Sequence, residues 1–346
     1  MDSKKKIFWS IFSLILAGLT IWAVVSQSKG ISLKEVIQSG AEGDKRYLAL
    51  AIVSVALYIW LEGVAICSIL KGVGYKRSPF RGILYSTADI YFSAITPSAT
   101  GGQPASAYFM IADGIPAGIA TAVLVLNLMM YTVSIVVLGI ISLFINHRLL
   151  LEFRPVSKII IIAGFFILTL FSLFFLSILR KGNKVFDVLT RFVKFLHSKH
   201  LIHRLEPKLK KLEDTRKEFV ECSDLVAGKA SVMVKAFFWN LIQRACQIAV
   251  PAFVYLTFGG EGGKALYIFA SQCLVTIGFN CIPVPGAMGI ADFLMVDGFT
   301  NLIGRDEAFK VDMMSRGLSF YICVALSGII TLIGYIILRR RRKKAA

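Results

Sequence analysis

The sequence has little of what the common soluble enzymes and metal proteins require. It contains four histidines and six cysteines in 346 residues, and no two cysteines form a CxxC pair. Most cysteines lie in apolar runs, so we expect buried free thiols rather than a disulfide or a zinc site. No Ser-His-Asp or paired-carboxylate pattern stands out, and no histidine lies within an apolar segment to serve as a base. We therefore assign no catalytic residue.

Nucleotide-binding and metal-binding motifs are also missing. The glycine-rich stretch Gly259–Gly263 lacks the GK[ST] ending of a phosphate loop, which favours a simple turn. His197, His200 and His203 form an HxxHxxH run. On one helix these side chains spread over more than one face, and no cysteine or acidic residue has fitting ligand spacing, which favours an interfacial polar face. We expect neither a cofactor nor a metal.

Apolar residues are what the sequence has in excess. They make up 56% of the chain, including 26 phenylalanines, and the mean hydropathy is +0.70. A soluble domain has roughly 45–50% apolar residues, and a bilayer is crossed by about 20 consecutive ones. The sequence therefore predicts an all-α polytopic membrane protein with a single membrane domain over residues 1–346.

The positive charge of the chain is concentrated beside the apolar runs. Thirty-nine lysines and arginines against 21 acidic residues give a net charge of +18. The basic residues gather in a few segments next to apolar stretches, as in the positive-inside arrangement of membrane proteins. This pattern indicates contact with anionic lipid at the cytoplasmic surface, and we do not expect nucleic acid as a partner.

Six segments are long enough to span a bilayer. They are Ile7–Val25, Tyr47–Leu70, Ile115–Ile145, Ile159–Leu179, Val232–Phe258 and Met313–Leu338. The first resembles a signal peptide after its lysines, but its length and the lack of a cleavage site favour a retained helix. Two segments are predicted as polar loops, Asn146–Lys158 and Gly304–Asp312, and the polar segment Ser26–Arg46 is expected to lie outside.

Two short breaks interrupt the apolar sequence, Thr96–Pro104 and Ile282–Asp292. Both are rich in proline and glycine, which remove a backbone donor or permit unusual backbone conformations. Inside a bilayer such a break is tolerated only where protein buries it or water reaches it. A matched pair of interrupted segments indicates a transporter binding site. We therefore predict re-entrant hairpins near residues 82–111 and 265–303, although Ala265–Cys281 could instead be a short full span.

The basic loops give a closed topology for these segments. Lys71–Arg81, Arg180–Lys229 and the terminal run Arg339–Lys344 are placed in the cytoplasm with both chain termini. The first hairpin then enters from the cytoplasm and the second from outside. The chain divides into halves 1–179 and 230–346, related as an inverted repeat.

The basic linker 180–229 joins the two halves. Phe186, Leu189, Phe192, Val193 and Leu196 recur at helical spacing between lysines and arginines. Amphipathic helices on the membrane surface and a solvated helical hairpin both fit this pattern.

Charged and polar residues at membrane depth are costly and usually functional. The predicted substrate-binding set is Glu62, Arg81, Asp89, Gly101, Gly102, Gln103, Pro104, Gln243, Arg244, Pro283, Pro285, Gly286, Gly289, Asp292 and Arg316. Arginine suits a phosphate because it donates two parallel hydrogen bonds. Aspartate or glutamate suits an amine, or neutralises the arginine when the site is empty. The set thus predicts a polar cavity. The alternative is that these residues form internal ion pairs that only hold the helices together.

The two breaks also carry a family resemblance. The residues concerned are Arg81–Tyr85, Thr96-Pro97, Gly101–Pro104, Pro283–Asp292 and Arg316–Tyr321. In this ordered set the chain resembles the lysylphosphatidylglycerol synthase transmembrane region family, the flippase-like membrane domain of the multiple peptide resistance factors. The chain ends at Ala346, where the full-length factors carry a soluble aminoacyl-transferase domain. The resemblance therefore implies a membrane region without that chemistry.

The resemblance implies a flippase-like transporter in the bacterial cytoplasmic membrane, linked to antimicrobial peptide resistance. It would move a phospholipid, in the first place aminoacylated phosphatidylglycerol, between leaflets. A membrane-embedded transferase of lysyl groups to phosphatidylglycerol, a non-catalytic membrane subunit of such an enzyme, and a regulatory or scaffold subunit are the alternatives. The expected partner is a membrane phospholipid, and both a homo-oligomer and a separate synthase stay open.

Overall fold

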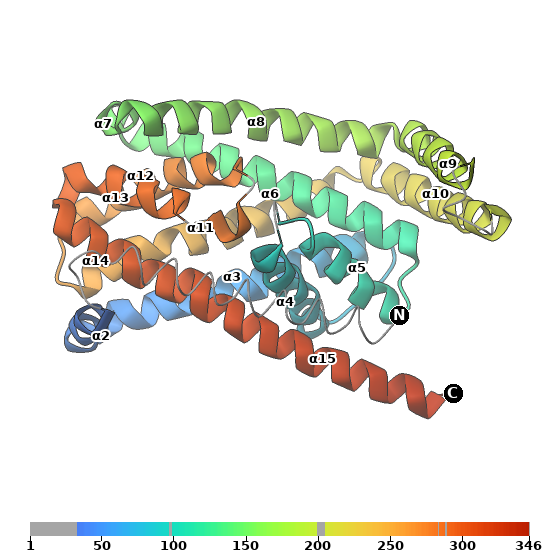
Figure 1. Ribbon diagram of the computed structural model, residues 1–346, viewed down its shortest axis with the longest axis horizontal. Coiled ribbons are helices and arrows are strands. Elements are labelled where there is room, and N and C mark those ends of the chain that lie inside the picture. Colours follow the sequence, from blue (N-terminus) through green and yellow to red (C-terminus); the bar gives the residue numbers. More distant parts are fainter. Residues whose placement is uncertain (1–32, 97–98, 199–204, 283, 288, 346) are drawn as a thin grey trace.

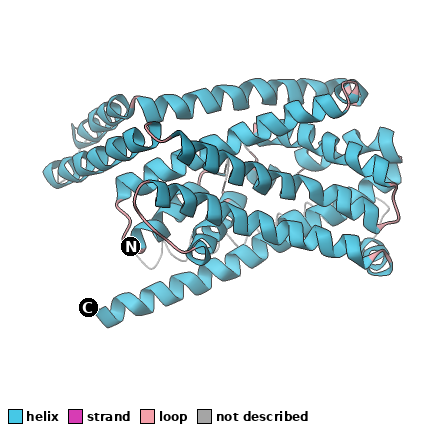
Figure 2. Cartoon of the chain, turned by 180° about the vertical axis from the view of Figure 1, so that it is seen from behind, coloured by secondary structure: helices cyan, strands magenta, loops and turns pink. Residues whose placement is uncertain are grey.

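The protein is built from helices. The computed structural model describes residues 33–96, 99–198, 205–282, 284–287 and 289–345, and this part of the chain contains helices and loops with no strand (Figure 2). The predicted helix Ile7–Val25 lies outside the described residues, as do Pro97, Pro283 and two members of the histidine run, His200 and His203.

The elements follow one another as α2 (Leu33–Glu42), α3 (Lys45–Gly72), α4 (Pro79–Ile95), α5 (Gly102–Ala112), α6 (Ala117–Ile145), α7 (Leu149–Glu152), α8 (Pro155–Arg180), α9 (Gly182–Ser198), α10 (Leu205–Ala227), α11 (Ala230–Thr257), α12 (Gly262–Asn280), η2 (Pro285–Ala287), α13 (Ile290–Ile303), α14 (Arg305–Arg316), the π-helical η3 (Gly317–Ile322) and α15 (Cys323–Ala345).

Within the described part of the chain, four helices are long and apolar enough to cross a membrane, which confirms a polytopic membrane protein. They are α3, α6, α8 and the continuous run from Arg305 to Arg340 (Figure 1). One side of α8 faces outward, because Phe166, Phe171 and Phe174 are exposed, whereas Phe165 and Phe175 pack against buried clusters. α10 and α11 meet at a bend of 89° and would make a fifth span if they are taken together.

The first break separates two antiparallel neighbours, α4 and α5. Ser78 accepts a hydrogen bond at the start of α4, and Pro79 follows in the first turn, where its missing donor is not needed. The far end of α5 returns to this start, since Arg81 forms an ion pair with Asp113 at 3.0 Å and Tyr85 donates to the same carboxylate at 2.6 Å. Both ends of this helical pair therefore lie at one end of the molecule.

The second break separates α12 from α13, which also pack against each other. Between them η2 contains Gly286 at φ 61°, and Gly289 at φ 77° precedes α13. Glycine adopts this left-handed region at little steric cost, so the chain can reverse within a few residues. η2 contacts α4, so the second break lies against the first helical pair.

The helix α3 holds α4 by direct backbone contact. Gly63 and Gly82 face each other, and a Cβ atom on Gly63 would lie 2.5 Å from the carbonyl carbon of Gly82. No side chain fits between the two helices at this point, so the buried stretch of α3 and α4 behaves as one packed unit.

Two of the predicted polar loops are wrong in the described chain. Gly304–Asp312 belongs to α14, which begins at Arg305 and continues through η3 into the last helix. Asp306 and Glu307 lie in the first turn of α14, where they are favourable with the helix dipole, and Ala308 and Val311 are buried. Polar composition therefore concealed an amphipathic helix.

Asn146–Lys158 is also mostly helical. It contains the single turn α7, and α8 already begins at Pro155. The described part of Ser26–Arg46 likewise contains α2 and the start of α3. The turn predicted at Gly259–Gly263 is confirmed, with Gly259 at φ 86° between α11 and α12.

The basic linker forms two helices, as its periodicity predicts. α9 and α10 pack together through Phe186 and Phe219, whose ring centroids are 5.6 Å apart. Glu218 on α10 accepts a hydrogen bond from the backbone of Gly118 at 2.8 Å, which ties the linker to α6. The linker is thus anchored to the helical body at the end where the C-terminus also lies (Figure 1).

Candidate functional site

Buried polar groups gather beside each of the two breaks. The apolar helices α3, α4, α11 and α12 each bury polar side chains, although polar residues are expensive inside a membrane. Side chains of α3, α4, α5 and α11 form an inner cluster beside the first break, and side chains of α13 and α14 form an outer cluster beside the second. η3 packs on α3, so the helix that carries part of the outer cluster also borders the inner one.

The inner cluster joins α3, α4, α5 and α11. Gln103 donates to Asp89 at 3.1 Å, and Gln243 donates to Glu62 at 3.3 Å. The Glu62 and Asp89 carboxyl groups lie within hydrogen-bonding distance of each other. Both acidic residues are less than 9% exposed. Four residues of the predicted set are therefore brought into one connected group.

Arg244 extends this group toward α6. Its Nε donates to Gln243 at 3.0 Å, and its guanidinium lies over the rings of Tyr131 at 4.0 Å and Tyr58 at 4.9 Å. Arg244 also donates to the Tyr58 hydroxyl at 3.3 Å. Aromatic faces attract a desolvated cation. The guanidinium is therefore held by protein groups on several sides.

Sequence reasoning missed several partners in this cluster. Tyr58 and Tyr131 contact the arginine, and Tyr131 donates to Asn280 on α12 at 2.7 Å. A tyrosine in an apolar helix has no local signal that separates an inward position from a lipid-facing one. Asn280 is not in the predicted set, and its link to Tyr131 joins α12 to α6.

The glycines of the first break allow close approach. A Cβ atom on Gly102 would lie 2.0 Å from Oδ1 of Asp89 and from Oγ of Ser93. Only glycine fits there, so Gly102 lets α5 begin directly against the acidic side chain. Gly101 donates its backbone N–H to Thr96 at 2.8 Å, and Pro104 lies exposed in the first turn of α5. These residues shape the break.

Arg81 is not part of the inner cluster. Its side chain is 48% exposed and pairs with Asp113 at the end of the α4–α5 pair. The described contacts do not join Arg81 to Glu62, Asp89 or Arg244.

The outer cluster is organised by Arg316. Its Nε donates to Asp292 at 2.9 Å, and its Nη2 donates to the carbonyl of Gly286 at 3.0 Å. Asp292 also accepts from the backbone N–H of Gly289 at 2.8 Å. One guanidinium therefore links α14 to η2 and to the start of α13. Pro285 is the first residue of η2, and Pro283 lies outside the described residues.

A cavity of about 350 Å³ adjoins this ion pair. It lies between α13 and α14, and the charged residues that line it are Asp292, Asp297, Asp312, Arg154, Arg305 and Arg316. Arg305 and Arg316 mark its length along α14, which corresponds to roughly 16 Å at the helical rise of about 1.5 Å per residue. The cavity thus extends from the α13–α14 turn to the second break.

Asp312 is the main residue of this cavity that sequence reasoning missed. It is 5% exposed, and its Oδ1 has no hydrogen-bond partner among the described residues. The acid was assigned to the end of a polar loop, because the stretch before it is hydrophilic. Its four-residue spacing from Arg316 would have indicated a shared helix face.

The arrangement can bind a ligand that carries both charges. Arg154, Arg305 and Arg316 supply guanidinium groups suited to phosphate oxygens, and Asp312 supplies a carboxylate suited to an ammonium. Among the described residues no three His, Cys, Asp or Glu side chains are arranged to hold a metal ion.

The chain was compared with known proteins. A family described as "Lysylphosphatidylglycerol synthase TM region" matches residues 10–327. A UPF0104 membrane protein of Pyrococcus horikoshii is 24% identical over 332 residues, covering 93% of this chain and 96% of that protein. A UPF0104 membrane protein of Archaeoglobus fulgidus is 24% identical over 241 residues, covering 67% and 69%. No solved structure matches the chain significantly.

Proposed function

Because this chain belongs to the lysylphosphatidylglycerol synthase transmembrane region family, we propose that it is a flippase-like transporter of phospholipid. Its substrate would be aminoacylated phosphatidylglycerol, with the headgroup in the polar cavity and the acyl tails in lipid. The observation that carries the proposal is the packing of the second break against the first helical pair, where η2 contacts α4 and Arg316 bridges η2 to α14.

In this proposal the α4–α5 and α12–α13 pairs are re-entrant hairpins that enter from opposite faces. The neighbouring ends of α4 and α5, joined by Arg81 and Asp113, support the first hairpin. The basic linker and the basic C-terminal segment lie at the same end of the molecule (Figure 1), which supports a cytoplasmic location for that end. The two halves would then form an inverted repeat around the clusters.

The two clusters would act in sequence. In the described conformation the cavity adjoins Arg316, so the lipid phosphate would first replace part of the Arg316–Asp292 contact. Glu62, Asp89 and Arg244 would form an inner station that opens after the second hairpin moves. Alternating access of this kind needs the two stations to exchange their exposure.

The test is transbilayer movement in reconstituted liposomes. Loss of labelled lysyl-phosphatidylglycerol from the outer leaflet is followed beside plain phosphatidylglycerol. Arg316→Ala should slow headgroup-dependent movement by about 10–100-fold, because hydrogen bonds to charged groups contribute about 1.5–3 kcal/mol each. The variant should keep the elution profile of the wild-type protein.

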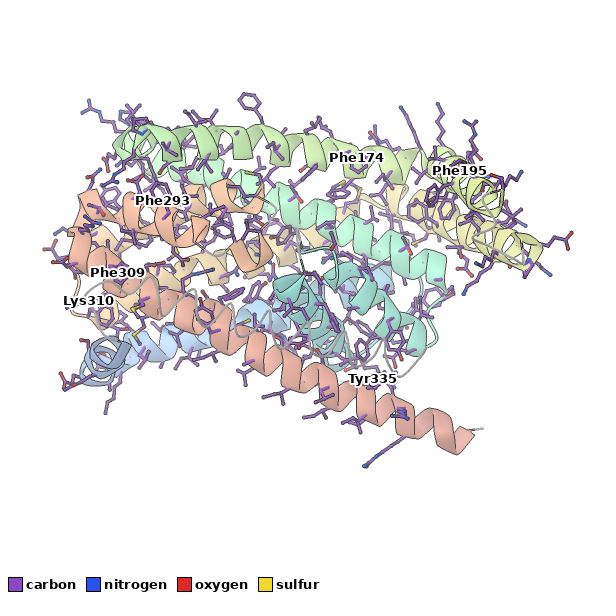
Figure 3. All side chains as sticks on the ribbon, viewed as in Figure 1. Phe174, Phe195, Phe293, Phe309, Lys310 and Tyr335 are labelled. Atoms are coloured by element: carbon purple, nitrogen blue, oxygen red, sulfur yellow. The ribbon has the colours of Figure 1, made fainter. Side chains whose placement is uncertain are left out.

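Lys310→Ala is the matched control. It removes a positive charge from α14 without touching the residues that line the cavity, and Lys310 lies on the outer side of that helix (Figure 3). Movement that is unchanged in Arg316→Ala would refute the role of Arg316. Failure of the wild-type protein to move either lipid would count against the flippase function itself.

A further inference from the structure

Asp312 has an unusual environment for an acidic residue in a membrane protein. It lines the cavity between α13 and α14, is 5% exposed, and its Oδ1 lacks a hydrogen-bond partner among the described residues. A buried polar atom without a partner costs free energy, and a buried carboxylate costs more. A side chain kept in this state beside an open cavity indicates a ligand that completes it.

The other two acids of the cavity already have partners. Asp292 accepts from Arg316 and from the backbone of Gly289. Asp297 accepts from the backbone of Arg154 at 3.0 Å and pairs with its side chain at 3.2 Å. Asp312 is therefore the acid of this cavity with an unpaired oxygen. A single carboxylate suits a monovalent ammonium better than a divalent metal, which needs several oxygen ligands.

The residues around Asp312 restrict the class of ligand further. Apolar walls are supplied by Phe293, Val296, Phe309 and Met313. Phe293 is 41% exposed, so the cavity reaches the apolar surface of the protein, and Phe293 and Phe309 lie toward the same end of the molecule (Figure 3). A ligand that bears an ammonium and an anionic group and borders an apolar surface fits this environment.

We propose that Asp312 receives a primary ammonium group of the headgroup while Arg316 binds its phosphodiester. The inference rests on the proposed lipid-binding function and assigns the amine to a residue. Asp312 and Arg316 are four residues apart on α14 and so lie on one face of the helix, one turn apart. The Arg316 guanidinium points to Asp292 and Gly286 instead of to Asp312, which leaves Asp312 free for the amine.

Binding to the detergent-purified full chain tests the assignment without transport. The soluble probes are sn-glycero-3-phosphoethanolamine and sn-glycero-3-phosphoglycerol, which share the phosphodiester and differ in the amine. The lipid probes are dihexanoyl phosphatidylethanolamine and dihexanoyl phosphatidylglycerol. Calorimetric titration gives the ratio of the two dissociation constants in each arm. Preference in the lipid arm alone identifies a lipid headgroup, and preference in both arms identifies the headgroup chemistry as sufficient.

Asp312→Asn should reduce the preference for the amine probe by about tenfold or more, because it removes a charged acceptor and keeps the shape. Affinity for the amine-free probe should hold, since Arg316 is intact. Asp306→Asn, an exposed acid on the same helix outside the cavity, should keep the wild-type ratio. Retained preference in Asp312→Asn, or no preference in the wild-type protein, would overturn the assignment.

The outcomes separate this inference from the transport function. Amine preference that depends on Asp312, together with no movement in liposomes, would support the site and reject the flippase. Movement of lipid without any dependence of binding on Asp312 would support the flippase and reject the site.

Discussion

The two breaks of the chain are alike in sequence and unlike in structure. The first packs closely: Gly102 lies against Asp89, and the neighbouring Arg244 is enclosed by two tyrosines and a glutamine. The second borders a cavity in which Arg316 reaches across to Asp292. Proline and glycine thus permit a break, but the side chains of neighbouring helices decide whether it is filled by protein or left open to a ligand.

This difference suggests that the two clusters have different roles. The first break is filled by side chains of α3, α4, α5 and α11, whereas the second break borders a cavity. If the protein alternates between two conformations, the described one gives access at the end where α13 turns into α14. Variants at each break test whether the first is closely packed and the second is open to the cavity.

Removing the enclosed arginine should have the largest effect. Arg244→Ala leaves Gln243, Tyr58 and the buried Glu62 without their cationic neighbour, so we expect the free energy of unfolding to fall by about 3–5 kcal/mol. Arg316→Ala should cost less, about 1.5–3 kcal/mol, because the cavity lets solvent reach Asp292. Thermal denaturation of both variants in one detergent measures the difference. Equal losses would show that both clusters are equally enclosed.

Thiol accessibility should show the next largest difference between the two breaks. Thr300→Cys places a thiol on the cavity, whereas Ser106→Cys places one at a fully buried position of α5. A membrane-impermeant maleimide should react with the first on the order of 100-fold faster, since a buried thiol reacts only through local opening. The wild-type chain gives the background from its own cysteines. Similar rates would contradict a closed first break.

A glycine substitution at the first break is expected to have the smallest effect on stability. Gly102→Ala forces the α4–α5 pair apart at Asp89 and should cost about 1–3 kcal/mol of stability. Gly263→Ala, in the first turn of α12, meets no atom within 4 Å and should be neutral or stabilising by up to about 1 kcal/mol. Denaturation midpoints compare the two. A neutral Gly102→Ala would mean that close packing at the first break is dispensable.

The spanning segments of the described chain were largely predictable, because length and apolar content determine what crosses a membrane. α3, α6 and α8 lie within a few residues of their predicted ranges. The predictions failed where polar composition and helical structure coincide, as in α14. The apolar face of α14 is narrow, with Ala308 and Val311 at its centre, so hydropathy averaging concealed it.

The candidate site could be predicted in part. Glu62, Asp89, Gln103, Gln243 and Arg244 were selected as polar groups at membrane depth, and they form one cluster. Their separation from Asp292 and Arg316 into a second cluster depends on how the helical pairs α4–α5 and α12–α13 pack in the fold, which a single sequence does not encode locally. Tyr58 and Tyr131 were not predicted, because only tertiary packing distinguishes them from other tyrosines.

The π-helical segment η3 has a mechanical consequence. It interrupts the long helix directly after Arg316, and π-helical turns are places where helices bend. The helix therefore consists of two segments, α14 and α15, that can bend relative to each other at η3. Asp312 and Arg316 lie on the same side of η3, so a small bend at η3 would move both side chains together while α15 kept its place against α4.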